Sequence, residues 1–210
     1  MIRAIAIKEL RETWWMALLA LCLALQMLPG KLQRYGNGPE GLPFVDDHFI
    51  EVEQFFFLLA IVLGLRQSAW ERLRGTYPFL LHRPARRSAV FATKMAVGLG
   101  LLLLTAAVPI VGYGVWASLS GTHASPFEWS MSAPAWSCWL SLPLGYLGAF
   151  ISGIFAARWY GTRLLPGVAG GLLFLAFFEK PWPIAIIGSV VLSGMLASLA
   201  CYLGETADFA

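Results

Sequence analysis

The sequence predicts an all-α integral membrane protein with six transmembrane helices and an amphipathic interfacial helix at its N-terminus. The first observation is composition: 58% of the 210 residues are hydrophobic, 13% are charged, and the mean hydropathy is +0.68. Soluble domains are nearer to half apolar and a quarter charged. The second observation is pattern, because six apolar runs alternate with polar intervals. We treat residues 1–210 as one transmembrane domain.

Residues 1–13 have helical periodicity, with Ile7, Leu10 and Trp14 on one stripe. The opposite face carries most of the charges of this segment: Lys8, Glu9, Arg11 and Glu12. This pattern favours a helix that lies on the membrane surface. A plain cytoplasmic extension of the first span is the alternative.

The six apolar runs are expected to cross the membrane. They lie at about residues 14–28, 49–65, 95–116, 134–157, 164–178 and 184–203. The first should stop at Pro29-Gly30, and Glu51 and Glu53 should sit at the outer end of the second. The fifth is short, at about 22 Å of helix, and places Gly167 and Gly171 at the small-xxx-small spacing of packed membrane helices.

The distribution of positive charge predicts the orientation. With both termini in the cytoplasm, twelve of the fifteen Lys and Arg residues fall on the cytoplasmic side. Only Lys31, Arg34 and Lys180 would then lie outside. Cytoplasmic loops of membrane proteins carry the excess of Lys and Arg, so we expect both termini to be cytoplasmic.

Several kinds of site are not favoured by the sequence. It contains no GxxxxGK[ST], HExxH or GxSxG motif. His48, His82 and His123 are far apart, and the three cysteines lie in apolar runs without a CxxC spacing. The spans are nearly free of charge, which argues against an ion-coupled carrier and an intramembrane enzyme. We expect no catalytic, cofactor or metal site on this chain.

Residues 66–94 form the longest polar interval, and it is basic. It sets one acid, Glu71, against Arg66, Arg72, Arg74, Arg83, Arg86, Arg87 and Lys94. Residues 68–74 lack a helix breaker and predict a short helix that Gly75 ends. Contact with anionic lipid is one interpretation of so basic a segment.

The order of residues in this interval resembles the loop of ABC-2 type transporter permeases. An acid is followed by Gly-Thr, a Leu pair, Pro, Arg, and a Lys that enters the third span. In this sequence they are Glu71, Gly75-Thr76, Leu80-Leu81, Pro84, Arg86 and Lys94. The N-terminal helix, the six spans and the lack of a nucleotide-binding domain are similar too. The resemblance implies a permease subunit of an ABC exporter, multi-pass in the bacterial cytoplasmic (inner) membrane.

In that family, residues 66–94 would be a cytoplasmic coupling loop with a coupling helix that docks on separate ATPase subunits. Those subunits would bind ATP and Mg, so this chain would be no enzyme and carry no cofactor of its own. The implied ATPase-coupling interface is Glu71, Arg72, Arg74, Gly75, Thr76, His82, Arg83, Pro84 and Arg86. Glu9 and Glu12 of the interfacial helix would add to the docking surface.

The resemblance further implies a second copy of this chain, or a homologous permease, as partner within membrane lipid. Nucleic acid is not an expected partner. An alternative function is a non-transport membrane anchor or assembly protein that recruits a cytoplasmic partner through its basic loop. At the outer mouth, Glu51 and Glu53 would either attract cations or be solvated charges at a loop end.

Overall fold

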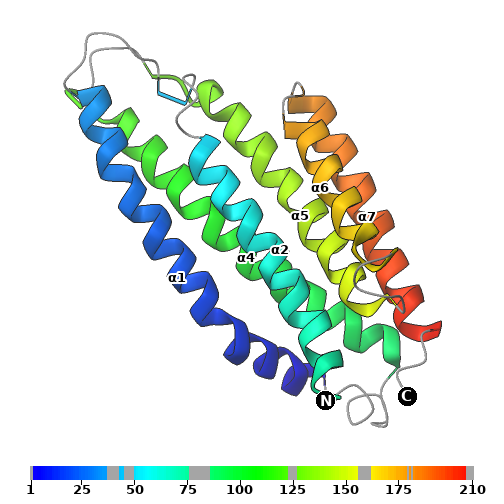
Figure 1. The fold of residues 1–210 in the computed structure, drawn as a ribbon. Helices are drawn as coiled ribbons and strands as arrows, with labels where there is room; N and C mark the ends of the chain where they lie inside the picture. Colours follow the sequence, from blue (N-terminus) through cyan, green and yellow to red (C-terminus); the bar gives the residue numbers. More distant parts are fainter. Residues whose placement is uncertain are drawn as a thin grey trace.

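The computed structural model describes residues 2–36, 43–44, 50–75, 86–122, 127–155, 162–178, 180 and 182–206. All regular elements within these ranges are helical. The α-helices are α1 (Ile2–Gly36), α2 (Ile50–Leu73), α4 (Arg87–Ser118), α5 (Ala133–Ile154), α6 (Leu165–Phe178) and α7 (Trp182–Thr206). Two short 3-10 helices, η2 (Trp129–Ser132) and η3 (Thr162–Leu164), precede α5 and α6. Figure 1 shows one elongated bundle, in which α1 begins and α7 ends at the same end.

Five helices of the described chain are long and apolar enough to cross a membrane: α1, α2, α4, α5 and α7. The sixth, α6, has 14 residues, about 21 Å of helix, against a hydrocarbon core of about 30 Å. Figure 1 shows α6 beside α5 and α7. The chain is therefore an all-helical bundle of the multi-pass membrane type, with five helices of spanning length and one shorter apolar helix.

The first helix is longer than expected. The described part of the N-terminal segment, residues 2–13, and the first span belong to the single helix α1, which continues through Pro29 to Gly36. The predicted stop at Pro29-Gly30 is therefore wrong. A proline removes one backbone hydrogen bond, and a membrane helix can continue past that loss. Figure 1 shows the first turns of α1 bent away from the direction of the rest.

The two helices that flank the basic interval also extend into it. α2 runs without a break to Leu73, so residues 68–73 are helical as predicted, but they continue the second span and do not form a short helix of their own. Gly75 does end it, with a φ of 62°, and its N–H donates to the carbonyl oxygen of Arg72 at 3.1 Å. α4 begins at Arg87. A coupling helix could only lie in residues 76–85, outside the described part of the chain.

The centre of the bundle is α5, which is buried from Ser141 to Ile154. It packs against α2 on one side and against α6 and α7 on the other. One close crossing joins Gly148 of α5 to Gly170 of α6. A Cβ built on Gly148 would lie 2.9 Å from the Gly170 Cα. Of the predicted pair, Gly167 donates its N–H to the Ser152 hydroxyl at 2.8 Å, whereas Gly171 faces Phe57.

Candidate functional site

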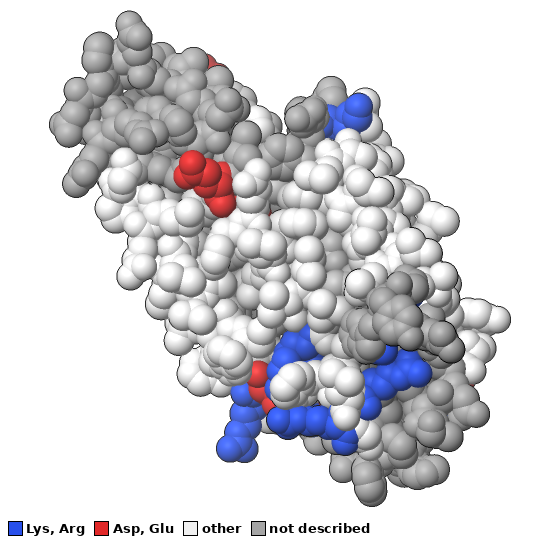
Figure 2. Space-filling model, viewed as in Figure 1, with Lys and Arg blue, Asp and Glu red and all other residues white. Residues whose placement is uncertain are grey.

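The end of the bundle at which α1 begins and α2 ends is called the basic end below. Exposed arginines of the described chain gather there: Arg3, Arg11, Arg74, Arg86 and Arg87. Figure 2 shows most of the blue side chains of that view at this end, next to a broad white band without charged side chains, and many large hydrophobic side chains of the bundle are exposed. Exposed arginines at one end of the bundle, beside a surface without charges, are expected of a membrane protein whose basic end lies in water.

Inside the basic end lies a fully buried lysine, Lys94 of α4. Its Nζ is 2.7 Å from Oε1 of Glu9 on α1 and 2.7 Å from Oε2 of Glu71 on α2. It also donates a hydrogen bond to the carbonyl oxygen of Gln67, at 3.2 Å. Because α2 and α4 continue as helices beyond the apolar runs, these three side chains meet within the bundle. A single cation therefore ties α1, α2 and α4 together.

Three further side chains complete this group. Lys8 donates to Oε1 of Glu71, and the Gln67 amide donates to Oε2 of Glu9 at 3.2 Å. The hydroxyl of Tyr146, from the middle of α5, donates to Oε1 of Gln67. We call these six residues the ion cluster: Lys8, Glu9, Gln67, Glu71, Lys94 and Tyr146. Its two lysines balance its two glutamates, which is what makes burial of the charges tolerable.

Close to the ion cluster, two arginines bind the C-terminal end of α5. Arg72 donates to the carbonyl oxygens of Ile154 and Phe155, at 3.1 and 3.0 Å. Arg163 of η3 is buried and donates to those of Ser152 and Gly153, at 3.1 and 2.9 Å. The last carbonyls of a helix have no partner within the helix itself. We call Arg72 and Arg163 the arginine cap, because together they satisfy these carbonyls.

The last turn of α2 connects the two groups. Neighbouring residues Glu71 and Arg72 point in different directions, one into the ion cluster and the other to the end of α5. The chain leaves α2 two residues later. The end of α2 is therefore bound to α1 and α4 through Glu71, and to α5 through Arg72.

The predicted interface residues separate into three groups. Glu71 and Glu9 are buried, 4% and 2% exposed, so they support the loop from inside and cannot form the expected acidic docking face. Arg72 is also engaged within the chain. Among the rest, Arg74, Gly75 and Arg86 are exposed, as is Arg11 of the N-terminal helix, whereas Glu12 is partly buried. Thr76, His82, Arg83 and Pro84 lie outside the described residues.

The predicted outer-mouth acids separate as well. Glu51 is exposed, whereas Glu53 is buried. Glu53 lines a small enclosed space between α2, α4 and α5, together with Ala106 and Cys138. The expectation that both carboxylates face water holds only for Glu51, because Glu53 falls on the face of α2 that packs against α4 and α5.

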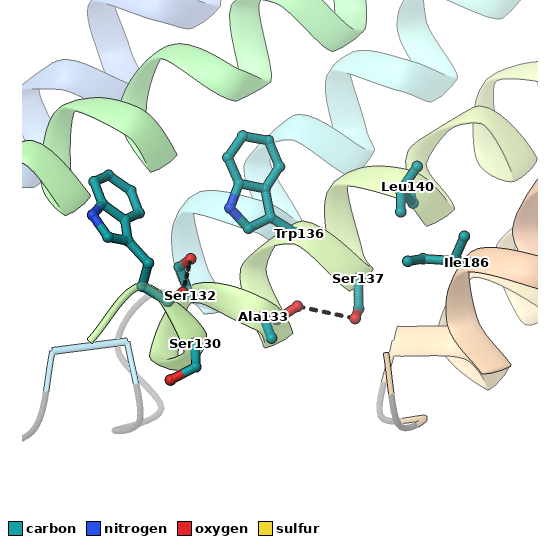
Figure 3. A pocket seen from close by; sticks show the side chains of 8 residues that line it. Ser130, Ser132, Ala133, Trp136, Ser137, Leu140 and Ile186 are labelled. Atoms are coloured by element: carbon teal, nitrogen blue, oxygen red, sulfur yellow. Dashed lines mark hydrogen bonds between the residues drawn. The ribbon is translucent and has the colours of Figure 1, made fainter. Parts of the chain in front are cut away.

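The opposite end of the bundle carries a larger hollow of about 510 Å³. Figure 3 shows it beside η2 and the first turns of α5, with Trp136 on one side and Leu140 and Ile186 at its far end. Two of its serines donate their hydroxyls to backbone carbonyl oxygens, Ser132 to that of Trp129 and Ser137 to that of Ala133, and Ser130 donates to the Glu128 carboxylate. The hollow therefore offers mostly apolar surface.

Within the described residues, no three His, Cys, Asp or Glu side chains come together as ligands for a metal ion. Sequence reasoning missed Gln67, Tyr146 and the capping role of Arg163. The signal for Gln67 was its i, i+4 spacing to Glu71, which becomes visible once α2 is known to continue. No family model, curated protein or solved structure matches this chain.

Proposed function

We propose that this chain is the permease subunit of an ABC-2 type exporter, driven by ATP that separate ATPase subunits hydrolyse with Mg. The proposal rests on the order of residues from Glu71 to Lys94. The observation that supports it best is the connection made by the last turn of α2. This turn precedes the proposed docking loop and is bound on one side to α1 and α4, and on the other to α5.

A docking loop can drive transport only if its movement reaches the helices. Helices move as rigid bodies when their ends are fixed by packing and hydrogen bonds, and a partner that binds one arrangement more tightly shifts the population toward it. Here the ion cluster and the arginine cap supply that fixing. ATP-driven closure of two ATPases would move residues 76–85, and Glu71 and Arg72 would carry the movement into the bundle.

In this proposal the basic end is cytoplasmic, both termini lie there, and the protein resides in the bacterial cytoplasmic membrane. α6 makes a sixth, short crossing. A second copy of the chain or a homologous permease completes the pathway. The docking surface consists of exposed residues at the two edges of the loop, Arg74 and Gly75 on one side and Arg86 on the other. Glu9 and Glu71 act as positioning residues beneath it.

The test first asks whether the neighbouring reading frame encodes a Walker-A ATPase, and then co-expresses that ATPase with this chain and purifies them in nanodiscs. Arg74→Glu with Arg86→Glu should abolish co-purification, because the two substitutions reverse the charge of the docking edges. Gln67→Leu should keep co-purification but reduce stimulation of ATP hydrolysis, because it breaks the link between α2 and Tyr146. Arg3→Glu, an exposed change at the same end, serves as the control.

If the ATPase still co-purifies with the doubly reversed variant, the docking assignment is wrong. If the ATPase binds the unaltered chain but its hydrolysis is not stimulated, the membrane anchor is the better function. Such a result would leave the ion cluster as a purely structural feature, because no motion would need to pass through it.

A further inference from the structure

We propose that a ridge at the C-terminal end of α2, formed by the partly exposed Arg66 and the exposed Trp70 and Arg74, binds the phosphate of an anionic phospholipid in the leaflet at the basic end. We call these three residues the Arg–Trp–Arg ridge. The inference does not depend on the proposed transport function. It requires only that the bundle is embedded in a membrane with its basic end at the water boundary.

The ridge places two guanidinium groups against the same indole ring. Arg66 and Arg74 stand one helical turn before and after Trp70, and their guanidinium carbons lie 5.1 and 4.9 Å from its ring centroid. Cation–π attraction holds both groups against the indole. A stacked guanidinium keeps its N–H edges available, and these match the oxygens of a phosphate.

The position of the ridge favours lipid over a soluble partner. Trp70 is 41% exposed, and the same i, i+4 ridge continues along the apolar wall through Val62 and Leu58, which are 47% and 60% exposed. Tryptophan prefers the membrane interface, at the level of the head groups. Figure 2 shows blue side chains bordering the white band at the basic end. A phospholipid reaches both surfaces at once, with acyl chains along Val62 and Leu58 and its phosphate at the arginines.

The charges around the ridge leave it attractive to an anion. Its one acidic neighbour among the described residues is Glu12 of α1, whose Oε2 lies 3.9 Å from Arg66. Arg74 makes no ion pair with any described residue. Glu71, on the same turn, is turned inward to Lys94 and Lys8, so its carboxylate does not cancel the ridge. An anionic lipid gains about fivefold in affinity for each such cation.

The experiment measures how the full chain selects between phosphatidylglycerol and phosphatidylcholine from equal mixtures, with bound lipids counted by native mass spectrometry. Arg66→Gln with Arg74→Gln should lower the preference for phosphatidylglycerol by about 30-fold, since two cations are lost. Arg86→Gln with Arg87→Gln removes the same charge from exposed positions at the same end and should change it far less. Trp70→Leu keeps both charges and should lower the preference by about fivefold.

If the two double variants lost the same preference for phosphatidylglycerol, the proposal would be overturned, because lipid selection would then follow net charge alone. An unchanged lipid preference in the ridge variant would also overturn it. If that variant kept its lipids but lost a co-purifying protein, the ridge would be a protein-docking surface. Melting temperatures of all three variants close to that of the unaltered chain establish that each is folded.

Discussion

Lys94 and Glu9 are 85 positions apart in the chain, and yet the Nζ of Lys94 lies 2.7 Å from Oε1 of Glu9 inside the bundle. Replacing Lys94 by Met would leave two carboxylates buried beside a single partly exposed lysine, Lys8. Losing one partner of a buried ion pair costs about 3–5 kcal/mol. We therefore expect Lys94→Met to lower the melting temperature in detergent sharply, as measured by loss of the monodisperse chromatographic peak after heating.

The matched control is Lys180→Met, which alters an exposed lysine and should shift stability by no more than about 0.5 kcal/mol. If Lys94→Met and Lys180→Met had the same melting temperature, Lys94 would have no ionic role in the bundle.

A double-mutant cycle can compare the buried pair with a looser one. Glu9→Gln and Lys94→Gln should show a coupling free energy toward the upper part of about 0.5–3 kcal/mol. Glu12→Gln and Arg66→Gln remove a more exposed pair at 3.9 Å, for which less than about 1 kcal/mol is expected. Unfolding of each variant in a mixed-micelle denaturation series supplies the values, and a larger coupling for the second pair would contradict this order.

We expect the replacement of Arg163 to destabilise the protein, although the sequence alone places Arg163 in a loop. Arg163→Gln would leave the carbonyls of Ser152 and Gly153 without their donor, at a cost of about 1–3 kcal/mol. Hydrogen exchange should rise selectively in the last turn of α5. Arg87→Gln, an exposed arginine at the start of α4, is the control. Exchange that rises uniformly along α5 would argue against a local cap.

The crossing of α5 and α6 leaves no room for a methyl group at Gly148. A Cβ there would lie 2.6 Å from the Pro166 carbonyl oxygen and 2.9 Å from the Gly170 Cα. Gly148→Ala should therefore destabilise the bundle by about 1–3 kcal/mol. Gly100→Ala meets nothing within 4 Å and should be neutral or stabilising by up to about 1 kcal/mol. Thermal unfolding of the two variants tests this difference, and similar melting temperatures would refute the close crossing.

The charge distribution predicts that both termini are cytoplasmic. A green fluorescent protein fused after Thr206 should therefore fluoresce in cells. Alkaline phosphatase fused after Thr122, beyond the far end of α4, should be active, because it folds only outside the cytoplasm. The reverse pattern of activities would invert the topology and place the Arg–Trp–Arg ridge in the outer leaflet.

Sequence reasoning located the helices well because apolar runs of this length have few other structures available. It also identified Gly75 as a residue that ends a helix, and Gly75 does adopt the left-handed conformation that glycine tolerates best. Its errors were at helix ends. Hydropathy falls where Arg66 begins, but a helix continues as long as its backbone is not interrupted, and α2 runs on to Leu73.

The sequence could not predict which charged side chains of the site are buried, for a related reason. Glu71 and Arg72 are adjacent in the sequence and both look like loop charges. Which of them turns inward depends on the rotation of α2 against α4 and α5, and this is fixed by close contacts such as that between Gly64 and Ala149. A charge count also treats Lys94 and Arg163 as surface cations, although both are buried.

The arginine cap has a consequence for the order in which the protein is made. The ion pairs of Lys94 need only α1, α2 and α4, so the first three long helices can neutralise their buried charges while later segments are still on the ribosome. The end of α5 is different, because one of its two arginines precedes it by about eighty residues and the other follows it. The cap of the central helix is therefore complete only once η3 is made, and a nascent chain stopped before Arg163 would leave the carbonyl oxygens of Ser152 and Gly153 without their donor.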